Sequence, residues 1–312
     1  MSTAVAGSDP AIRVEGLGKR YGTAVAVDEL SFDVASGSCF GLLGPNGSGK
    51  STTIQMLATL LAPSAGRAWI AGRELAREPV AVRAAIGLVF QDTALDRSLS
   101  ADENLRFAGA LYGLSRAAIR ARADELLALF ELTDKRALPV ARLSGGQRRA
   151  LDIARGVLHQ PRVLFLDEPT TGLDLVNRRA VWRFLDQLRA RHGTTLVLTT
   201  HLLEEAAGCD QVLFLKAGAT IAHAAPAQLI ARLGAFILDV DGGDVAALTA
   251  FADLGDHIGA GDGRSFRITD PAFTLAALDP QRVARVRSVR LRRPDLNDVY
   301  LWLAAGRLRE GA

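Results

Sequence analysis

The chain has 312 residues, of which 49% are hydrophobic and 23% are charged. A sizeable buried core is therefore possible, and general disorder and collagen-like or low-complexity structure are excluded. The 37 basic and 34 acidic residues leave a net charge of only +3, so the composition gives no reason to expect a nucleic-acid partner, and we predict none.

The N-terminal segment lacks the features of a secretion signal. The first ten residues, MSTAVAGSDP, have neither the basic nor the apolar region of a signal peptide, and residues 1–11 are expected to be flexible. No window reaches the roughly 18 uninterrupted apolar residues of a membrane span. Two cysteines, Cys39 and Cys209, are too few for a disulfide scaffold or a zinc cluster. We therefore expect a soluble cytoplasmic chain that can still dock on a membrane protein.

Strand-like and helical runs alternate along residues 12–223, which predicts an α/β fold with crossover helices. The clearest predicted strands are Cys39–Leu43, Ile86–Phe90, Val163–Leu166, Thr195–Thr199 and Gln211–Leu215. The last three are nearly all apolar, as expected for strands covered on both faces. From about residue 92 to residue 158 helical periodicity dominates, as in Ser115–Phe130, and it predicts a helical subdomain inserted into the α/β unit.

The composition changes again near Ala224–Gly234. The pattern that follows predicts a strand at Phe236–Val240, a helix at Val245–Ala252, turns rich in Gly and Asp, and a terminal helix after Pro294. We interpret residues 224–312 as a separate, small α+β accessory domain.

A glycine-rich segment, GPNGSGKS at residues 44–51, follows an apolar strand and opens a helix predicted over Thr52–Leu61. This is the context of a phosphate-binding loop, because glycines let successive N–H groups point at phosphate oxygens and a helix N-terminus favours negative charge. Lys50 would reach the β- and γ-phosphates of a nucleotide, and the Ser51 hydroxyl would bind Mg²⁺. The predicted nucleotide-binding residues here are Gly44, Pro45, Asn46, Gly47, Ser48, Gly49, Lys50, Ser51 and Thr52.

The apolar strand at Val163–Leu166 ends in two carboxylates, Asp167 and Glu168. The carboxyl end of a parallel strand is where an α/β sheet places ligand-binding groups. Asp167 would hold Mg²⁺ through its water shell, and Glu168 would orient or deprotonate an attacking water.

A third motif, LSGGQ at residues 143–147, leads into a helix. Its Ser-Gly-Gly entry offers a hydroxyl, free N–H groups and the helix dipole to an anion, although an ordinary serine N-cap has the same sequence. The residues assigned to nucleotide binding from this motif are Ser144, Gly145, Gly146 and Gln147.

These three motifs in this order resemble those of the ATP-binding subunits of ABC transporters, whose signature sequence is LSGGQ. The resemblance spans about residues 12–222 and implies an ABC-type P-loop NTPase fold and ATP hydrolysis. It also implies that Tyr21 stacks on adenine, that Gln91 senses Mg²⁺ and faces a membrane subunit, that Asp174 belongs to the D-loop, and that His201 touches the γ-phosphate. The predicted catalytic residues are then Lys50, Gln91, Glu168 and His201, and the predicted Mg²⁺ ligands are Ser51, Gln91 and Asp167.

The same resemblance implies how ATP is held. In the family the signature faces the phosphate loop of a partner, so one chain cannot close a site alone. Two copies of this chain would form a homodimer with ATP and Mg²⁺ between them. One position departs from the family pattern, because Leu175 follows Asp174 where Pro is usual, and this should loosen the turn slightly.

Three further segments, at residues 90–105, 200–206 and 293–300, resemble the daunorubicin-resistance type of drug-exporter ATPase. Membership of that type implies a separate polytopic membrane subunit of the ABC-2 type, peripheral attachment at the cytoplasmic side of the cell membrane, and efflux of a drug or antibiotic-like compound. The C-terminal extension would support dimerisation or regulation, or it is a simple solvated domain.

A function of another class stays open, namely a soluble ABC-type ATPase with a regulatory or mechanochemical role and no transport. The sequence contains neither a long coiled coil nor a second ATPase unit, and this favours the exporter. The exported compound is not encoded here, because the membrane subunit would select it.

Overall fold

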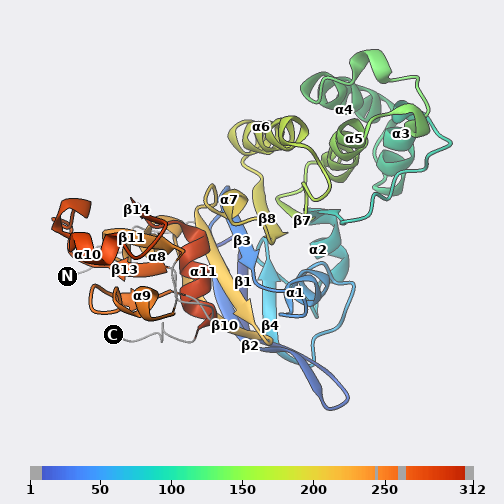
Figure 1. Ribbon diagram of the computed structural model, residues 1–312. Coiled ribbons are helices and arrows are strands. Elements are labelled where there is room, and N and C mark those ends of the chain that lie inside the picture. The colour runs from blue at the N-terminus through green and yellow to red at the C-terminus, as the bar shows by residue number, and fades with distance from the viewer. Residues whose placement is uncertain (1–8, 243–244, 259–264, 306–312) are drawn as a thin grey trace. The chain divides into compact units, whose positions relative to one another are not determined.

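The computed structural model describes residues 9–242, 245–258 and 265–305 (Figure 1). The predicted flexible segment, residues 1–11, therefore lies mostly outside the described residues. The chain divides into two compact units, the first holding residues up to 201 and 215–220, the second holding residues 202–214 and those from 221 onward. The predicted domain boundary at 223/224 stays a prediction.

Four parallel strands form the middle of the first unit: β3 (Cys39–Leu43), β6 (Ile86–Val89), β7 (Val163–Asp167) and β8 (Thr195–Thr200). They are the neighbouring members β3-β8-β7-β6 of a six-stranded sheet whose order begins with β10 (Ala219–Ala224) and β9 (Gln211–Lys216). Residues 163–166 of β7, every residue of β8 and residues 212–215 of β9 are buried, which confirms the prediction that these three strands are covered on both faces.

The first unit contains a second sheet, which the apolar pattern did not predict. Its order is β2-β1-β4-β5, formed by β1 (Ile12–Tyr21), β2 (Ala24–Val34), β4 (Ala65–Ile70) and β5 (Arg73–Glu74). All its pairings are antiparallel, and the register between β1 and β2 shifts at three places. These irregularities interrupt the alternation of apolar and polar residues that would have marked the strands.

The helices of this unit include the predicted ones. They are α1 (Lys50–Leu57), α2 (Pro79–Ala85), α3 (Ala101–Leu111), α4 (Arg116–Leu129), α5 (Gly145–Val157) and α6 (Leu175–His192), with 3-10 turns at Thr133–Lys135 and Val140–Arg142. The helices α3, α4 and α5 pack together, as Figure 1 shows in teal to green. Ser115 caps α4 through the N–H of Ala118, so this helix matches the predicted span Ser115–Phe130.

The helix α1 ends four residues earlier than the predicted Leu61. Thr59 adopts the left-handed conformation, with φ of 60°. The N–H groups of Thr59 and Leu60 then fold back onto the carbonyls of Met56 and Gln55, which closes the helix before Pro63 is reached.

The second unit has the α+β composition expected of the C-terminal segment. It contains α7 (Leu203–Ala206), α8 (Pro226–Ala231), β11 (Phe236–Asp241), α9 (Val245–Thr249), β12 (Asp256–His257), β13 (Ser265–Ile268), a 3-10 turn at Leu275–Ala277, α10 (Pro280–Val283), β14 (Ser288–Arg292) and α11 (Leu296–Ala304). The strands form an antiparallel sheet in the order β12-β13-β11-β14.

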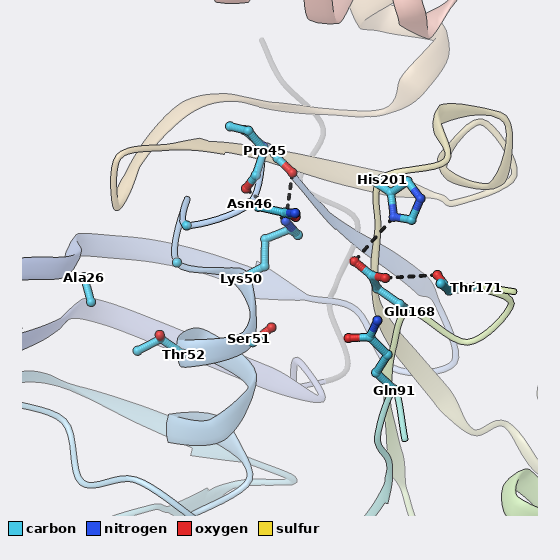
Figure 2. A pocket seen from close by; sticks show the side chains of 13 residues that line it. Ala26, Pro45, Asn46, Lys50, Ser51, Thr52, Gln91, Glu168, Thr171 and His201 are labelled. Carbon is cyan, nitrogen blue, oxygen red and sulfur yellow. Dashed lines mark hydrogen bonds and ion pairs between the residues drawn. The ribbon is translucent and has the colours of Figure 1, made fainter. Parts of the chain in front are cut away.

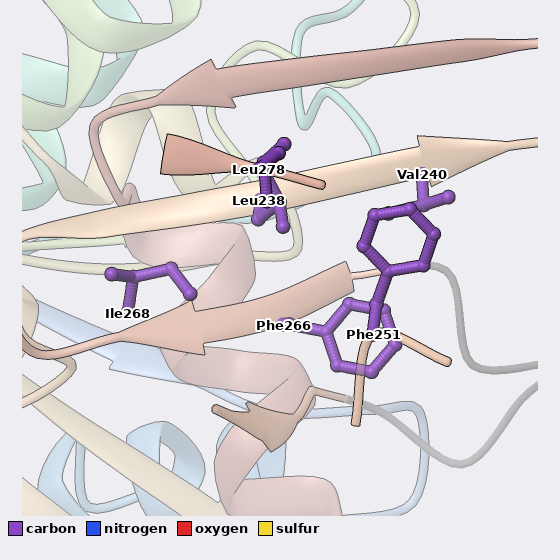
Figure 3. Packing of buried hydrophobic residues seen from close by; sticks show 6 residues of the cluster. All are labelled: Leu238, Val240, Phe251, Phe266, Ile268 and Leu278. Atoms are coloured by element: carbon purple, nitrogen blue, oxygen red, sulfur yellow. The ribbon is translucent and has the colours of Figure 1, made fainter. Parts of the chain in front are cut away.

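One face of this sheet carries an apolar core (Figure 3). Its buried members are Leu238, Val240, Phe251, Phe266, Ile268 and Leu278. At the end of β14, Arg292 binds both Asp239 of β11 and Asp298 of α11, with its Nη2 2.8 Å from Asp298 Oδ1. This ion pair and a capping box between Asp295 and Asp298 fix the start of α11. Across both units, the described helices include none that is long and apolar enough to cross a membrane.

Candidate nucleotide-binding site

A cavity of about 890 Å³ in the first unit brings together residues from five separate segments (Figure 2). It is lined by Ala26, Gly44, Pro45, Asn46, Gly47, Gly49, Lys50, Ser51, Thr52, Gln91, Glu168, Thr171 and His201. The glycine-rich segment forms one wall, and the residues that follow β6, β7 and β8 form the other, so the cavity lies at the carboxyl ends of the parallel strands.

The glycine-rich segment has the conformation of a loop that only glycine permits at two positions. Gly44 has φ of 148°, and a Cβ there would lie 2.3 Å from the carbonyl oxygen of Leu215. Gly49 has φ of 103°, and a Cβ there would lie 2.6 Å from the carbonyl oxygen of Ala26. The chain therefore turns sharply between β3 and α1 and leaves the N-terminus of α1 open toward the cavity.

Lys50 is held inside this loop by its own backbone. Its Nζ donates hydrogen bonds to the carbonyl oxygens of Gly44 at 2.8 Å and Pro45 at 3.1 Å. Burial lowers the pKa of Lys50, and the carboxylates of Glu168 and Asp167 oppose that shift. The ammonium group thus sits at the cavity wall on two neutral acceptors, which an anion could outcompete.

The same loop contains a buried hydroxyl group, that of Ser48. Ser48 is buried, and its Oγ has no hydrogen-bond partner within the described part of the chain. A buried hydroxyl without a partner is costly, but Ser48 does not line the cavity, so we assign it no contact with a ligand. The glycine cradle and Lys50, which do line the cavity, make the loop a good fit for a triphosphate.

One hydroxyl group forms hydrogen bonds with both acidic residues at the end of β7. Thr199 of β8 is fully buried, and its Oγ1 donates to Asp167 Oδ1. The same oxygen accepts the N–H of Glu168 at 3.0 Å. Glu168 itself has φ of 46°, which is sparsely populated for a residue with a Cβ. The Thr199 contacts hold this turn, and the turn aims the Glu168 side chain into the cavity.

The Glu168 carboxylate has two neighbours in the cavity wall. Thr171 Oγ1 donates to Glu168 Oε2 at 2.9 Å, and His201 Nδ1 lies 3.4 Å from Glu168 Oε1. Gln91 also points into this part of the cavity, as Figure 2 shows. A carboxylate, an imidazole and an amide facing a phosphate loop can position a water for attack on a terminal phosphate.

The LSGGQ motif lies elsewhere in the unit. Ser144 and Gln147 form a capping box at the start of α5, and Gly145 is open, with nothing within 4 Å of a Cβ built on it. Asp174 caps the neighbouring helix α6 through the N–H of Asn177 at 2.9 Å. That hydrogen bond and the one from the Asn177 side chain lower the pKa of Asp174. This second group of predicted residues forms an exposed pair of helix N-termini.

The structure therefore separates the predicted site residues into two groups. Of the residues predicted from the sequence, eleven line the cavity: Gly44, Pro45, Asn46, Gly47, Gly49, Lys50, Ser51, Thr52, Gln91, Glu168 and His201. The predicted residues that do not line the cavity are Ser48, Asp167, Ser144, Gly145, Gly146, Gln147, Asp174 and Tyr21, and the first two are chain neighbours of residues that do. Tyr21 lies at the end of β1 and is 52% exposed, with Lys19 Nζ 5.3 Å from the centre of its ring.

Two residues of this region escaped the sequence analysis as functional candidates. Thr199 lies in a predicted strand, and Arg149 follows LSGGQ by two positions. A single threonine or a single arginine forms no sequence motif from which a function could be predicted. Their importance depends on contacts with segments distant in the sequence.

Comparison with known proteins supplies the remaining evidence. A protein-family model described as "ABC transporter" matches residues 27–171. The daunorubicin resistance ATP-binding protein DrrA3 of Streptomyces coeruleorubidus is 42% identical over 98% of this chain and 100% of its own length. The Nod factor export ATP-binding protein I of Ralstonia nicotianae is 41% identical over 97% of both chains. Nearly full-length likeness at this level decides the family. The chain belongs to the ABC transporter family of ATP-binding proteins.

Solved structures agree with this assignment. The ABC ATPase resembles cbiO1 of Clostridium perfringens, part of the ABC transporter complex cbiONQ, with a TM-score of 0.67 and 30% identity over 72% of this chain and 92% of that one. It also resembles the ATP-binding cassette MJ0796 in a dimeric, post-hydrolysis state bound to ADP and Pi, with a TM-score of 0.62 and 27% identity over 68% and 97% of the two chains. The predicted fold class and the predicted ATPase activity are thereby confirmed.

Proposed function

We propose that this ABC ATPase binds and hydrolyses ATP to drive efflux of a drug or antibiotic-like compound through a separate polytopic membrane subunit of the ABC-2 type. The observation that carries the proposal is the single cavity that unites the phosphate loop with Gln91, Glu168 and His201. Nearly full-length likeness to ATP-binding proteins named for daunorubicin resistance and for Nod factor export supports the direction of transport.

The predicted site residues would have separate roles in hydrolysis. The loop around Lys50 would bind the β- and γ-phosphates, and the Tyr21 ring would stack on the adenine. Glu168 would act as the general base for the attacking water, and His201, within reach of the same carboxylate, would contact the γ-phosphate. Mg²⁺ would be held by the oxygens of Ser51, Gln91 and Asp167, which are the hard ligands that this ion prefers.

The site would be completed by a second copy of the chain. Ser144 and Gly145 are exposed at the start of α5, and they do not line the cavity of their own chain. A homodimer with two-fold symmetry would place each signature on the partner's nucleotide. The signature of each chain would then face the phosphate-binding cavity of the other chain, and both contacts would be the same. We place the dimer at the cytoplasmic side of the cell membrane as a peripheral subunit.

The ATP-binding proteins named for daunorubicin resistance and Nod factor export are almost equally similar to this chain, at 42% and 41% identity. Two relatives that are named for different compounds thus have nearly the same sequence identity to this chain, which supports the inference that the membrane subunit selects the compound. The C-terminal segment, residues 224–312, would then serve the ATPase dimer or its regulation. The soluble regulatory alternative is not favoured by these relatives, which are named for resistance or export.

Reconstitution tests the proposal. The chain would be co-purified with its membrane subunit, placed in lipid vesicles, and supplied with ATP, Mg²⁺ and a panel of fluorescent amphipathic drugs. We expect ATP-dependent movement of at least one compound and none with Glu168→Gln. ATP hydrolysis without any membrane partner and without movement of any compound would favour the soluble alternative instead.

A further inference from the structure

One buried arginine contacts the backbone next to Gln91 and the backbone at Glu168, although it does not line the cavity. Arg149 belongs to α5, two residues after the signature, and is 7% exposed. Its Nε donates to the carbonyl oxygen of Pro169 at 2.6 Å, and its Nη1 donates to the carbonyl oxygen of Phe90 at 2.5 Å. Its Nη2 lies 3.3 Å from the carbonyl oxygens of both Asp167 and Glu168.

These four acceptors belong to the backbone that carries the predicted catalytic side chains. Phe90 directly precedes Gln91, and the other three are the consecutive residues at the end of β7. One side chain of α5 thus binds all four of these backbone carbonyls, and the carbonyl of Glu168 also accepts the N–H of Thr171 at 3.3 Å. The positions of Gln91 and Glu168 therefore depend on where α5 holds its guanidinium group.

The chemistry of the contact requires arginine. A guanidinium group is planar and presents five N–H donors in a rigid fork, whereas a lysine ammonium is a compact point charge. Burial lowers the pKa of Arg149, and the carboxylates of Asp152 and Asp167 oppose that shift. A fork that reaches the carbonyl oxygens of both Phe90 and Pro169 cannot be replaced by a single ammonium.

We propose that Arg149 is a positioning residue for ATP hydrolysis, which ties the signature helix α5 to the backbone of Gln91 and Glu168 in the same chain. The inference rests on the proposed function. Because the signature would act on the partner's nucleotide, Arg149 would connect the helix that senses one ATP to the carboxylate that hydrolyses the other.

The same helix offers a matched control. Arg155 also bonds Asp152, with its Nε 3.1 Å from Asp152 Oδ1. Arg149 Nη1 lies 3.6 Å from the other oxygen of that carboxylate. If Arg149 serves only to neutralise the buried Asp152, removal of either arginine should have the same effect.

The test compares Arg149→Lys, Arg149→Met and Arg155→Met in the full chain, with ATP affinity, kcat and the urea midpoint measured for each. We expect kcat to fall by about 10²-fold in both Arg149 variants, as a small misplacement of a catalytic group does, with ATP affinity retained. Arg155→Met should keep the kcat of the unaltered chain. Should Arg149→Met fail to fold, Arg149→Lys keeps a positive charge beside Asp152 and still lacks the fork.

Two results would overturn the inference: a normal kcat in Arg149→Lys, or an equal loss of kcat in Arg155→Met. Glu168→Gln is run beside them to separate this inference from the proposed function. If Glu168→Gln hydrolyses ATP as fast as the unaltered chain, the proposed mechanism itself fails. If Glu168→Gln is inactive and Arg149→Lys is normal, only the role of Arg149 fails.

Discussion

At the residue scale, Thr199 illustrates how a buried hydroxyl can order a catalytic turn. It gives one hydrogen bond to Asp167 and accepts one from the N–H of Glu168, so its donor and one of its acceptor positions are both used. Thr171 and His201 contact only the carboxylate of Glu168, whereas Arg149 Nη2 lies 3.3 Å from its carbonyl oxygen. Thr199 binds the N–H group, so the left-handed turn at Glu168 is held by Thr199 on one side and by Arg149 on the other.

Thr199→Val keeps the shape of the side chain and removes both hydrogen bonds. Leaving a buried carboxylate oxygen and an N–H group with one partner fewer should lower the free energy of unfolding by about 1–3 kcal/mol. The kcat for ATP should fall as well, while Thr199→Ser should stay close to the unaltered chain. Urea unfolding and an ATPase assay measure the two effects, and equal behaviour of the Val and Ser variants would contradict this role.

At the element scale, the start of α5 contains two adjacent glycines in opposite surroundings. A Cβ on Gly146 would lie 2.0 Å from Asn177 Oδ1 and 2.9 Å from Asn177 Cβ, whereas a Cβ on Gly145 would meet nothing within 4 Å. Gly146 thus permits the close approach of α5 to the start of α6. Gly145 leaves an open surface, which would face the partner's nucleotide in the proposed dimer.

Gly146→Ala and Gly145→Ala should consequently fail in different assays. Gly146→Ala should lower stability by about 1–3 kcal/mol, because Asn177 must move and its bonds to Asp174 are disturbed. Gly145→Ala should fold normally and lose ATPase activity. Thermal unfolding and ATP turnover distinguish the two, and a destabilised Gly145→Ala would mean that this position is packed.

The end of α3 is joined to the strand β6 by an aromatic stack. The rings of Tyr112 and His159 lie 3.6 Å apart, and His159 Nε2 donates to the carbonyl oxygen of Ile86 at 2.8 Å. Its Nδ1 is buried without a partner in the described part of the chain. Burial lowers the pKa of His159, and the Ile86 contact raises it less. Folding therefore favours the neutral form of this imidazole.

We expect acid to lower the free energy of unfolding through protonation of His159. The unfolded chain binds a proton at His159 near pH 6.5, before the folded chain does, so stability falls as the pH drops from about 7 through that value toward the lowered folded pKa. His159→Phe keeps a ring against Tyr112 and removes the titration. The urea midpoint of this variant should depend less on pH between 7.5 and 5, and an identical pH dependence in both proteins would count against the effect.

The helices and strands differ in how well the sequence predicts them. The strands β3, β7 and β8 were predicted within one residue because they are buried on both faces and read as apolar runs. The sheet formed by β1, β2, β4 and β5 was not, because register shifts break its alternation. The phosphate loop follows from residue chemistry. The roles of Gln91 and His201 came from family resemblance, because single residues in separate segments of the chain form no sequence pattern with Glu168.

At the scale of the whole molecule, the two groups of predicted residues need one another but do not meet within the chain. The cavity contains the phosphate loop and Glu168, while Ser144 and Gly145 are exposed outside its lining. In the proposed dimer a second copy would resolve this separation, because its signature would cover the nucleotide that the first copy leaves open. ATP would then join the subunits, and hydrolysis would release them.

The most direct test is the molecular mass of Glu168→Gln in solution with ATP and Mg²⁺, measured by light scattering during size-exclusion chromatography. Loss of the general base should slow hydrolysis by about 10²–10⁴-fold and so preserve the ATP-bound state. We predict a mass of twice 33.1 kDa, which returns to 33.1 kDa when Ser144→Arg is added. A Glu168→Gln chain that holds ATP and Mg²⁺ tightly at a mass of 33.1 kDa would contradict the account.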